Sequence, residues 1–201
     1  MENKLKGKIF NAQEVQALIA GNKTQFREVI KNQPCIELGS GTIERSPISD
    51  SIFYWKGSKN YSMFSFGKCP YKVGQKIFCK ESFDPMFYEA SSKNDEIAYK
   101  ADLKQKNHYI GGWKPAQHMK QEHSRLTLLI KEIKVERLAE ISREDCLLEG
   151  VESYYTEGAF HTGLIDEIEA FEDIWNATHK EPEEKFEANP WVWKVEMEVV
   201  K

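Results

Sequence analysis

The sequence lacks the features that would place it in a membrane or on a secretory route. None of its apolar runs approaches the roughly 18 residues that a membrane-spanning helix needs. The first ten residues, MENKLKGKIF, are charged and contain no apolar stretch typical of a secretion signal. We therefore expect a cytoplasmic protein that has no membrane partner.

Cysteine is also scarce, and its spacing excludes two classes of small protein. The four cysteines are widely separated and form no Cys-x-x-Cys pair, which argues against both a disulfide framework and a zinc knuckle. We expect buried free thiols at Cys35, Cys69, Cys79 and Cys146. The sequence shows no internal repeat, no low-complexity tract and no sign of a bound metal or organic cofactor.

The composition is that of one compact globular domain. The chain has 201 residues, of which 40% are hydrophobic and 12% aromatic, enough to bury a substantial core. We expect a single domain over residues 1–201. Turn residues are frequent between residues 33 and 70, where two apolar segments are still able to pack, so we expect a partly ordered insertion there.

Hydrophobic periodicity predicts short helices alternating with strands. Asn11 and Glu14 have the spacing of a helical capping box, and Gly21 stands where a left-handed C-cap belongs. Apolar alternation predicts a long strand whose phase slips between Ile130 and Ile133. The expected helices span about residues 12–20, 142–150 and 164–177, and the expected strands about 77–82, 126–135 and 191–199. This pattern favours an α+β fold with a small curled sheet or barrel and helices packed around it.

Charge is distributed unevenly although the net charge is only -4. Residues 103–125 contain five lysines or arginines, three histidines and one acid, which makes this segment a basic strip. Residues 136–189 contain sixteen acids and four basic residues, a balance of 4 - 16 = -12. We expect a polyanion to approach only one side of such a molecule.

Five motifs together give the chain a resemblance to a known family. They are a G-x-K-T sequence after the first helix (21–24), the strand GQKIFCKES (74–82), an H-M pair (118–119), ISREDCLLEG (141–150) and NPWVW (189–193). In this order they resemble the ASCH-domain family, especially the subset often encoded by phages and prophages. The resemblance implies a PUA-like fold, a small β-barrel associated with RNA.

The leading expectation is a protein that binds RNA or a modified nucleoside or nucleotide in a cleft of the barrel. A ring between two cations is a common arrangement for stacking on a base while the cations meet phosphate. We expect the cleft to be lined by Lys23, Thr24, Phe26, Arg27, Glu81 and Glu149. Trp113 and Trp191 are candidate aromatic walls, with Trp191 equally a core candidate, and His118 and Arg125 are candidate phosphate ligands.

Three other functions remain open on the sequence alone. Small bacterial relatives imply an amidohydrolase of N4-acetylcytidine, for which Lys23 and Glu149 carry over, whereas the usual threonine nucleophile is replaced by Phe26. Thr24 or a water molecule would then have to serve, because a hydroxyl nucleophile needs an adjacent base. A ribonuclease would use His118 with Lys23, and a protein-interaction module would use the acidic face of 136–189. The sequence gives no indication of the oligomeric state.

Overall fold

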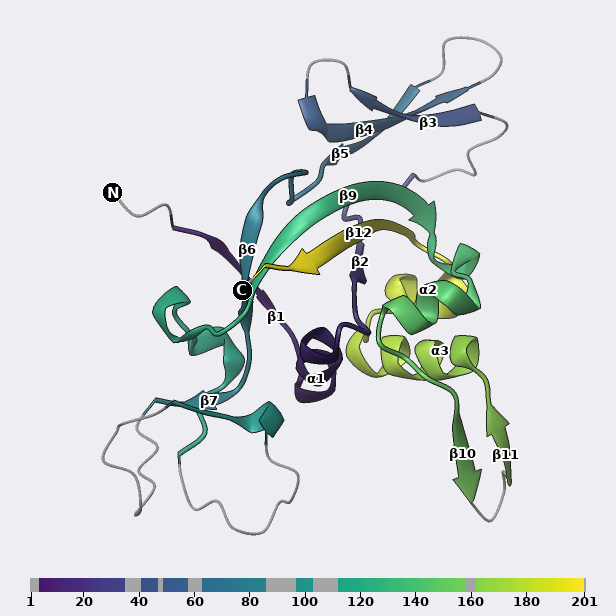
Figure 1. The fold of residues 1–201 in the computed structure, drawn as a ribbon. Coiled ribbons are helices and arrows are strands. Elements are labelled where there is room, and N and C mark those ends of the chain that lie inside the picture. The colour runs from purple at the N-terminus through teal and green to yellow at the C-terminus, as the bar shows by residue number, and fades with distance from the viewer. Residues whose placement is uncertain are drawn as a thin grey trace, which may run out of the picture. The chain divides into compact units, whose positions relative to one another are not determined.

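A computed structural model of the chain describes residues 4–34, 41–46, 49–57, 63–85, 97–102, 112–157 and 162–200 (Figure 1). Two compact units divide the chain between them. Unit 1 comprises Met1–Lys23, Lys76–Leu129 and Glu198–Lys201, and unit 2 comprises Thr24–Gln75 and Ile130–Met197. Residues 103–111 of the predicted basic strip and Cys35 lie outside the described residues.

Among the described residues, the main sheet of unit 1 contains three strand segments, and the unit has one α-helix. β1 (Lys6–Ile9) runs parallel to β6 (Lys76–Lys80), with Gly7 opposite Phe78. β6 in turn pairs antiparallel with the first residues of β9 (Thr127–Arg137). The other elements of unit 1 are β7 (Phe83–Asp84), β8 (Ala98–Tyr99) and the 3-10 turns η1 (Lys100–Asp102), η2 (Ala116–His118) and η3 (Gln121–His123).

The α-helix of unit 1, α1 (Ala12–Ala20), confirms the prediction made from its capping residues. The Asn11 side chain accepts a hydrogen bond from the Glu14 backbone N–H, and the Glu14 carboxylate accepts one from the Asn11 N–H. Gly21 ends the helix with φ at 79°, a left-handed conformation that glycine adopts without steric cost. The reciprocal cap satisfies two N-terminal N–H groups and fixes where the chain enters the helix.

Unit 2 contains a second set of strands with two helices packed beside them. β2 (Gln25–Val29) runs antiparallel to β12 (Trp191–Val199), with Phe26 opposite Val195. β10 (Tyr154–Glu157) and β11 (Thr162–Ile165) form a hairpin before α3. The remaining elements are α2 (Arg143–Leu148), α3 (Glu167–Thr178) and the 3-10 turns η4 (Leu138–Glu140), η5 (Pro182–Glu184) and η6 (Phe186–Ala188).

Burial of the apolar faces of α2 and α3 gives unit 2 part of its core. The shared cluster contains Leu138, Ile141, Cys146, Val151, Ala170, Phe171, Trp175 and Val192. Each large side chain buried in this way contributes about 1.5–3 kcal/mol relative to exposure. The Trp175 indole also donates a 2.7 Å hydrogen bond to the Glu184 carbonyl, so its polar atom is satisfied inside the cluster.

The segment expected to be a partly ordered insertion contains a three-stranded antiparallel sheet. It consists of β3 (Gly41–Ser46), β4 (Ser49–Gly57) and β5 (Met63–Lys68). Phe53 packs against Trp193, and Phe66 packs against Trp191, each with ring centroids 5.0 to 5.3 Å apart. These aromatic pairs attach the small sheet to β12 within unit 2.

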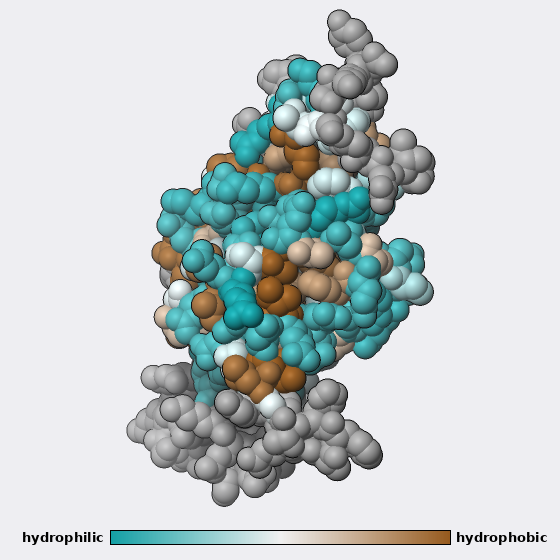
Figure 2. Space-filling model, turned by 90° about the vertical axis from the view of Figure 1, so that its right-hand side faces the viewer, coloured by the Kyte–Doolittle hydropathy of each residue, from teal (hydrophilic) through white to brown (hydrophobic). Residues whose placement is uncertain are grey.

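The structure confirms a mixed α+β fold, whereas the barrel remains a prediction. No strand pairing among the described residues closes either unit into a barrel. Within the same residues, no helix is both long and apolar enough to cross a membrane. In the view of Figure 2, hydrophilic residues cover most of the described surface and smaller hydrophobic areas interrupt them. Exposed apolar residues in unit 2 include Leu147, Leu148, Leu164 and Ile174.

Candidate functional site

Unit 1 contains a groove with a volume of about 820 Å³. It lies along the start of β1, one face of β6 and the two 3-10 turns η2 and η3. Its lining residues are Lys4, Leu5, Gly7, Phe78, Lys80, Gln117, His118, Met119, Lys120, Gln121, Glu122 and Ser124. The volume falls within the range of pockets that enclose one small organic ligand.

Three lysines from distant parts of the chain meet around this groove. Lys4 precedes β1, Lys80 ends β6, and Lys120 lies between η2 and η3. Among the described lining residues, the one acid is Glu122, whose carboxylate lies 3.4 Å from Lys120 Nζ in an exposed pair. Exposed pairs of this kind hold their partners weakly, so Lys120 remains available to an incoming anion.

Close approach of β1 to β6 shapes the floor of the groove. A Cβ added at Gly7 would lie 2.6 Å from Lys80 Cδ and 2.8 Å from Phe78 Cζ, closer than real contacts allow. The position therefore suits glycine because both neighbouring side chains cross it. Lys80 Nζ donates a 2.7 Å hydrogen bond to the Gln117 carbonyl, which directs this cation toward η2.

Two residues of the predicted cleft, Lys23 and Glu81, belong to unit 1. The Lys23 side chain is only 2% exposed, and its Nζ lies 3.4 Å from Glu14 Oε1. Because Glu14 also caps α1, this contact links Lys23 to the first turn of the helix. The spacing of Asn11 and Glu14 predicted the cap, whereas no local pattern relates Glu14 to Lys23.

Glu81 and Arg125 form a paired, partly buried group in unit 1. Arg125 donates from Nε and Nη2 to the two Glu81 oxygens at 2.9 and 3.0 Å, and from Nη1 to Asp102 at 2.8 Å. The guanidinium lies over the Tyr99 ring, 4.1 Å from its centroid. Burial raises the pKa of Glu81, and the hydrogen bonds from Arg125 oppose that rise. Arg125 is therefore engaged by two carboxylates, which leaves it poorly placed as a general phosphate ligand.

The thiol of Cys79, two residues before Glu81, is unreactive. Cys79 is buried, and burial raises the pKa of its thiol, with the charge on Glu81 adding to the effect. A protonated thiol is neither a nucleophile nor a good metal ligand. Among the described residues, no group of three or more histidines, cysteines or acids is placed to hold a metal ion.

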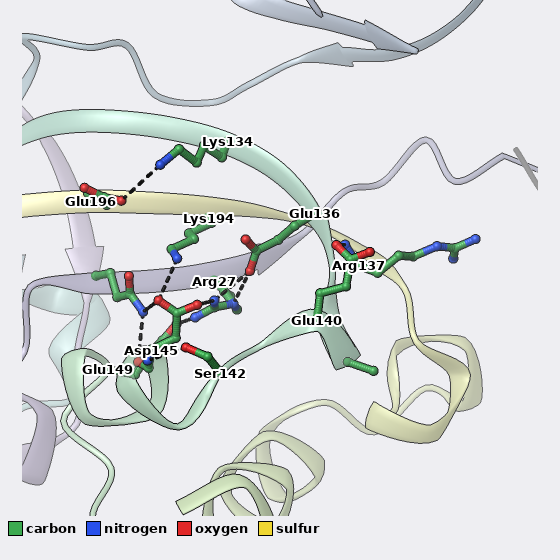
Figure 3. Close-up of polar contacts among 12 residues, drawn as sticks. Arg27, Lys134, Glu136, Arg137, Glu140, Ser142, Asp145, Glu149, Lys194 and Glu196 are labelled. Carbon is green, nitrogen blue, oxygen red and sulfur yellow. Dashed lines mark hydrogen bonds and ion pairs between the residues drawn. The ribbon is translucent and has the colours of Figure 1, made fainter. Parts of the chain in front are cut away.

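In unit 2, Arg27 lies at the centre of a buried ionic network (Figure 3). Its Nε donates to Glu136 at 2.8 Å, its Nη1 to Glu149 at 2.8 Å and its Nη2 to Asp145 at 2.9 Å. The Arg27 side chain is 0% exposed, and its three nitrogens all face protein carboxylates. The network joins β2, β9 and α2, so Arg27 has a structural role. Its engaged nitrogens make it unsuited to bind a ligand.

Asp145 ties two further residues into the same network. Lys194 Nζ donates to Asp145 Oδ1 at 2.6 Å, and Gln25 Nε2 donates to the same oxygen at 3.1 Å. Burial by itself would raise the pKa of Asp145, but these hydrogen bonds and the charge on Arg27 lower it to about 2. Asp145 therefore stays ionised and holds the N-terminal half of α2 against β2 and β12.

The other predicted cleft residues of unit 2 lie in the core or beside the end of α2. Phe26 is 3% exposed and packs edge-on against Tyr71, so the ring belongs to the core and is not presented for stacking. The Thr24 N–H donates to the Leu148 carbonyl at 2.8 Å, which places Thr24 beside the end of α2, where Glu149 follows. Trp191 is buried under Arg137, whose guanidinium lies 4.5 Å from the ring centroid.

His118 is the predicted ligand residue that lines the groove. It is exposed on η2 and has Gln117 Nε2 3.4 Å from its Nε2. Trp113 is half-buried in the same unit, beside the Phe83–Lys114 bridge. Lys4 and Lys80 were missed because nothing in the local sequence relates them to the basic strip; the parallel pairing of β1 with β6 brings them there.

Comparison with known proteins identified no relative. The chain gave no significant match to a family model, a curated protein or a solved structure. The ASCH resemblance therefore remains a prediction from the five sequence motifs.

Proposed function

We propose that this protein binds RNA, or a modified nucleotide, through the groove of unit 1. The observation that carries the proposal is the convergence of Lys4, Lys80 and Lys120 on one concave surface whose described lining residues include a single acid. Lysines gathered in this way attract phosphate and release counterions when phosphate binds. The PUA-like barrel and the cytoplasmic location implied by the sequence belong to the same proposal.

The groove also carries groups suited to a nucleoside. Gln117 and Gln121 contribute neutral amide groups to the lining, and Phe78 contributes apolar surface. Proteins commonly recognise unpaired nucleotides by combining cations for phosphate with amides and rings for the base. The chemistry of the lining therefore matches a phosphorylated nucleotide better than a purely apolar or a purely anionic partner.

Fluorescence anisotropy with a labelled single-stranded RNA tests the proposal. We expect Lys80→Gln and Lys120→Gln each to weaken binding several-fold, because each removes one phosphate contact. The matched control is Lys180→Gln, which removes an exposed lysine from unit 2. The proposal fails if the double variant Lys80→Gln with Lys120→Gln binds RNA as tightly as the control.

A second candidate is a ribonuclease, and the position of His118 favours it. An exposed imidazole in a groove with three lysines is suited to proton transfer while the lysines hold phosphate. Lys23, the partner predicted for His118, is instead paired with Glu14. Incubation of RNA with the protein and, separately, with the His118→Ala variant distinguishes cleavage from binding. Cleavage lost in the variant supports the ribonuclease, and intact RNA in both samples leaves binding as the function.

A further inference from the structure

Packing holds the Lys80 side chain along the groove before any ligand binds. Its stem crosses Gly7, because a Cβ built at Gly7 would lie 2.6 Å from Lys80 Cδ and 3.0 Å from Lys80 Cγ. Its Nζ lies 6.0 Å from the centroid of the Phe78 ring and donates a 2.7 Å hydrogen bond to the Gln117 carbonyl. Since these contacts already restrict its rotamers, Lys80 loses less conformational entropy than a free lysine when an anion binds.

The three lysines of the groove keep donor capacity for a ligand. An ammonium group has three N–H donors, and among the described residues Lys80 Nζ uses one of them on the Gln117 carbonyl. Lys4 is exposed before β1, and the Lys120 side chain is 74% exposed beside Glu122. A surface pair of that kind is weak, so it does not withhold Lys120 from an anion. Ammonium groups from three segments are therefore available to one ligand.

The number and charge of these cations match a phosphate monoester better than a phosphodiester. Three lysines and Glu122 give the described lining a formal charge of +2. A monoester carries about -1.5 to -2 at pH 7 and presents three acceptor oxygens. A diester within a strand carries one negative charge and has fewer free oxygens. Because a volume of about 820 Å³ suits one small ligand, a strand placed there contributes about one phosphate.

We propose that the groove binds a phosphate monoester, at the end of an RNA strand or on a free nucleotide, in preference to a phosphodiester within a strand. The inference rests on the proposed function, since it assumes that the groove is the nucleotide site. Lys80 is the positioned phosphate ligand, and Lys4 and Lys120 supply the remaining positive charge. The preference concerns the phosphate, so it is independent of the base.

Competition between unlabelled strands of equal charge and a labelled single-stranded RNA measures this preference. A six-nucleotide uridine strand with a terminal phosphate and an eight-nucleotide strand with hydroxyl ends both carry about -7, so general attraction to cations is equal. We expect the phosphorylated strand to bind about 5- to 20-fold more tightly, the effect of about one further hydrogen bond to a charged group. Separate strands with a 5′-phosphate and with a 3′-phosphate test the two ends.

Two lysine variants test whether the groove is the source of the preference. Lys80→Gln should bring the affinity ratio of the two strands close to one, because it removes the positioned ammonium. Lys120→Gln alters an exposed residue with no packing role, so it should lower the ratio in an intact fold. Lys180→Gln, an exposed lysine of unit 2, is the control and should keep the ratio.

Uridine monophosphate and uridine identify the source of the monoester. If the monophosphate competes as well as the phosphorylated strand and uridine does not, the ligand is a free nucleotide. Competition by the phosphorylated strand alone indicates an RNA end. Equal competition by the charge-matched strands, with the phosphate at either end, would overturn the inference and leave RNA binding intact, as would a ratio that both lysine variants keep. If RNA does not bind, or binding is insensitive to the lysines, the proposed function itself fails.

Discussion

Replacing Arg27 with methionine should destabilise the fold strongly, because three carboxylates would lose their shared cation. Arg27 is completely buried and donates to Glu136, Asp145 and Glu149 at 2.8 to 2.9 Å. Methionine keeps much of the side-chain length, so the loss comes mainly from charge and hydrogen bonds. Removing one partner of a buried ionic group costs about 3–5 kcal/mol, because the remaining charges stay desolvated.

Urea denaturation at neutral pH, followed by far-UV circular dichroism, measures this loss. Arg143→Met is the matched control, since Arg143 also pairs with an acid, Asp166, but is 65% exposed. Solvent screens that surface pair, so we expect the control to change the midpoint very little. Equal stability losses in the two variants would refute the structural role assigned to Arg27.

The same network predicts how stability changes in acid. The folded-state pKa of Asp145 is about 2, below its ordinary value near 4 in an unfolded chain. A lowered pKa means that Asp145 contributes stability above the unfolded value, and that this contribution is lost as pH falls from about 4 toward 2. Asp145→Asn should therefore lower the urea midpoint at pH 7 and converge with the unmodified protein near pH 2. A constant difference across that range would contradict the assignment.

Two further predictions concern the other predicted chemistry and the groove floor. Purified protein should release little acetate from N4-acetylcytidine, because Lys23 is paired with Glu14 and Glu149 is paired with Arg27. Turnover that is lost in Glu149→Ala would instead support the amidohydrolase hypothesis. Gly7→Ala should lower the free energy of unfolding by about 1–3 kcal/mol, because the added Cβ would overlap the Phe78 and Lys80 side chains. Urea denaturation measures this loss. A midpoint equal to that of the wild type would show that both side chains move away freely.

Local sequence signals predicted the elements that depend on neighbouring residues. The structure confirms the predicted caps of α1, the predicted alternation of β12 and the predicted phase slip in β9. In that strand Leu128 and Ile130 are buried on one phase and Ile133 and Val135 on the other. The helix predicted from residue 164 starts at 167 in the structure, because residues 162–165 pair with β10 instead.

The site was harder to predict because it depends on contacts between distant segments. The motif 21–27 was expected to project several side chains into one cleft, whereas the fold buries Phe26 in the core and surrounds Arg27 with carboxylates. Those outcomes depend on Tyr71 and on Glu136, which no local pattern relates to the motif. The groove likewise requires the parallel register of β1 with β6, and periodicity carries no information about strand partners.

The salt dependence of RNA affinity tests the central claim most directly. Three phosphate contacts from Lys4, Lys80 and Lys120 predict that log K falls with log salt at a slope of about -2 for a single strand. The double variant Lys80→Gln with Lys120→Gln should reduce the slope to about -0.7, because one lysine remains. A slope near zero, or one that the double variant leaves unchanged, would contradict the assignment of the groove as the RNA site.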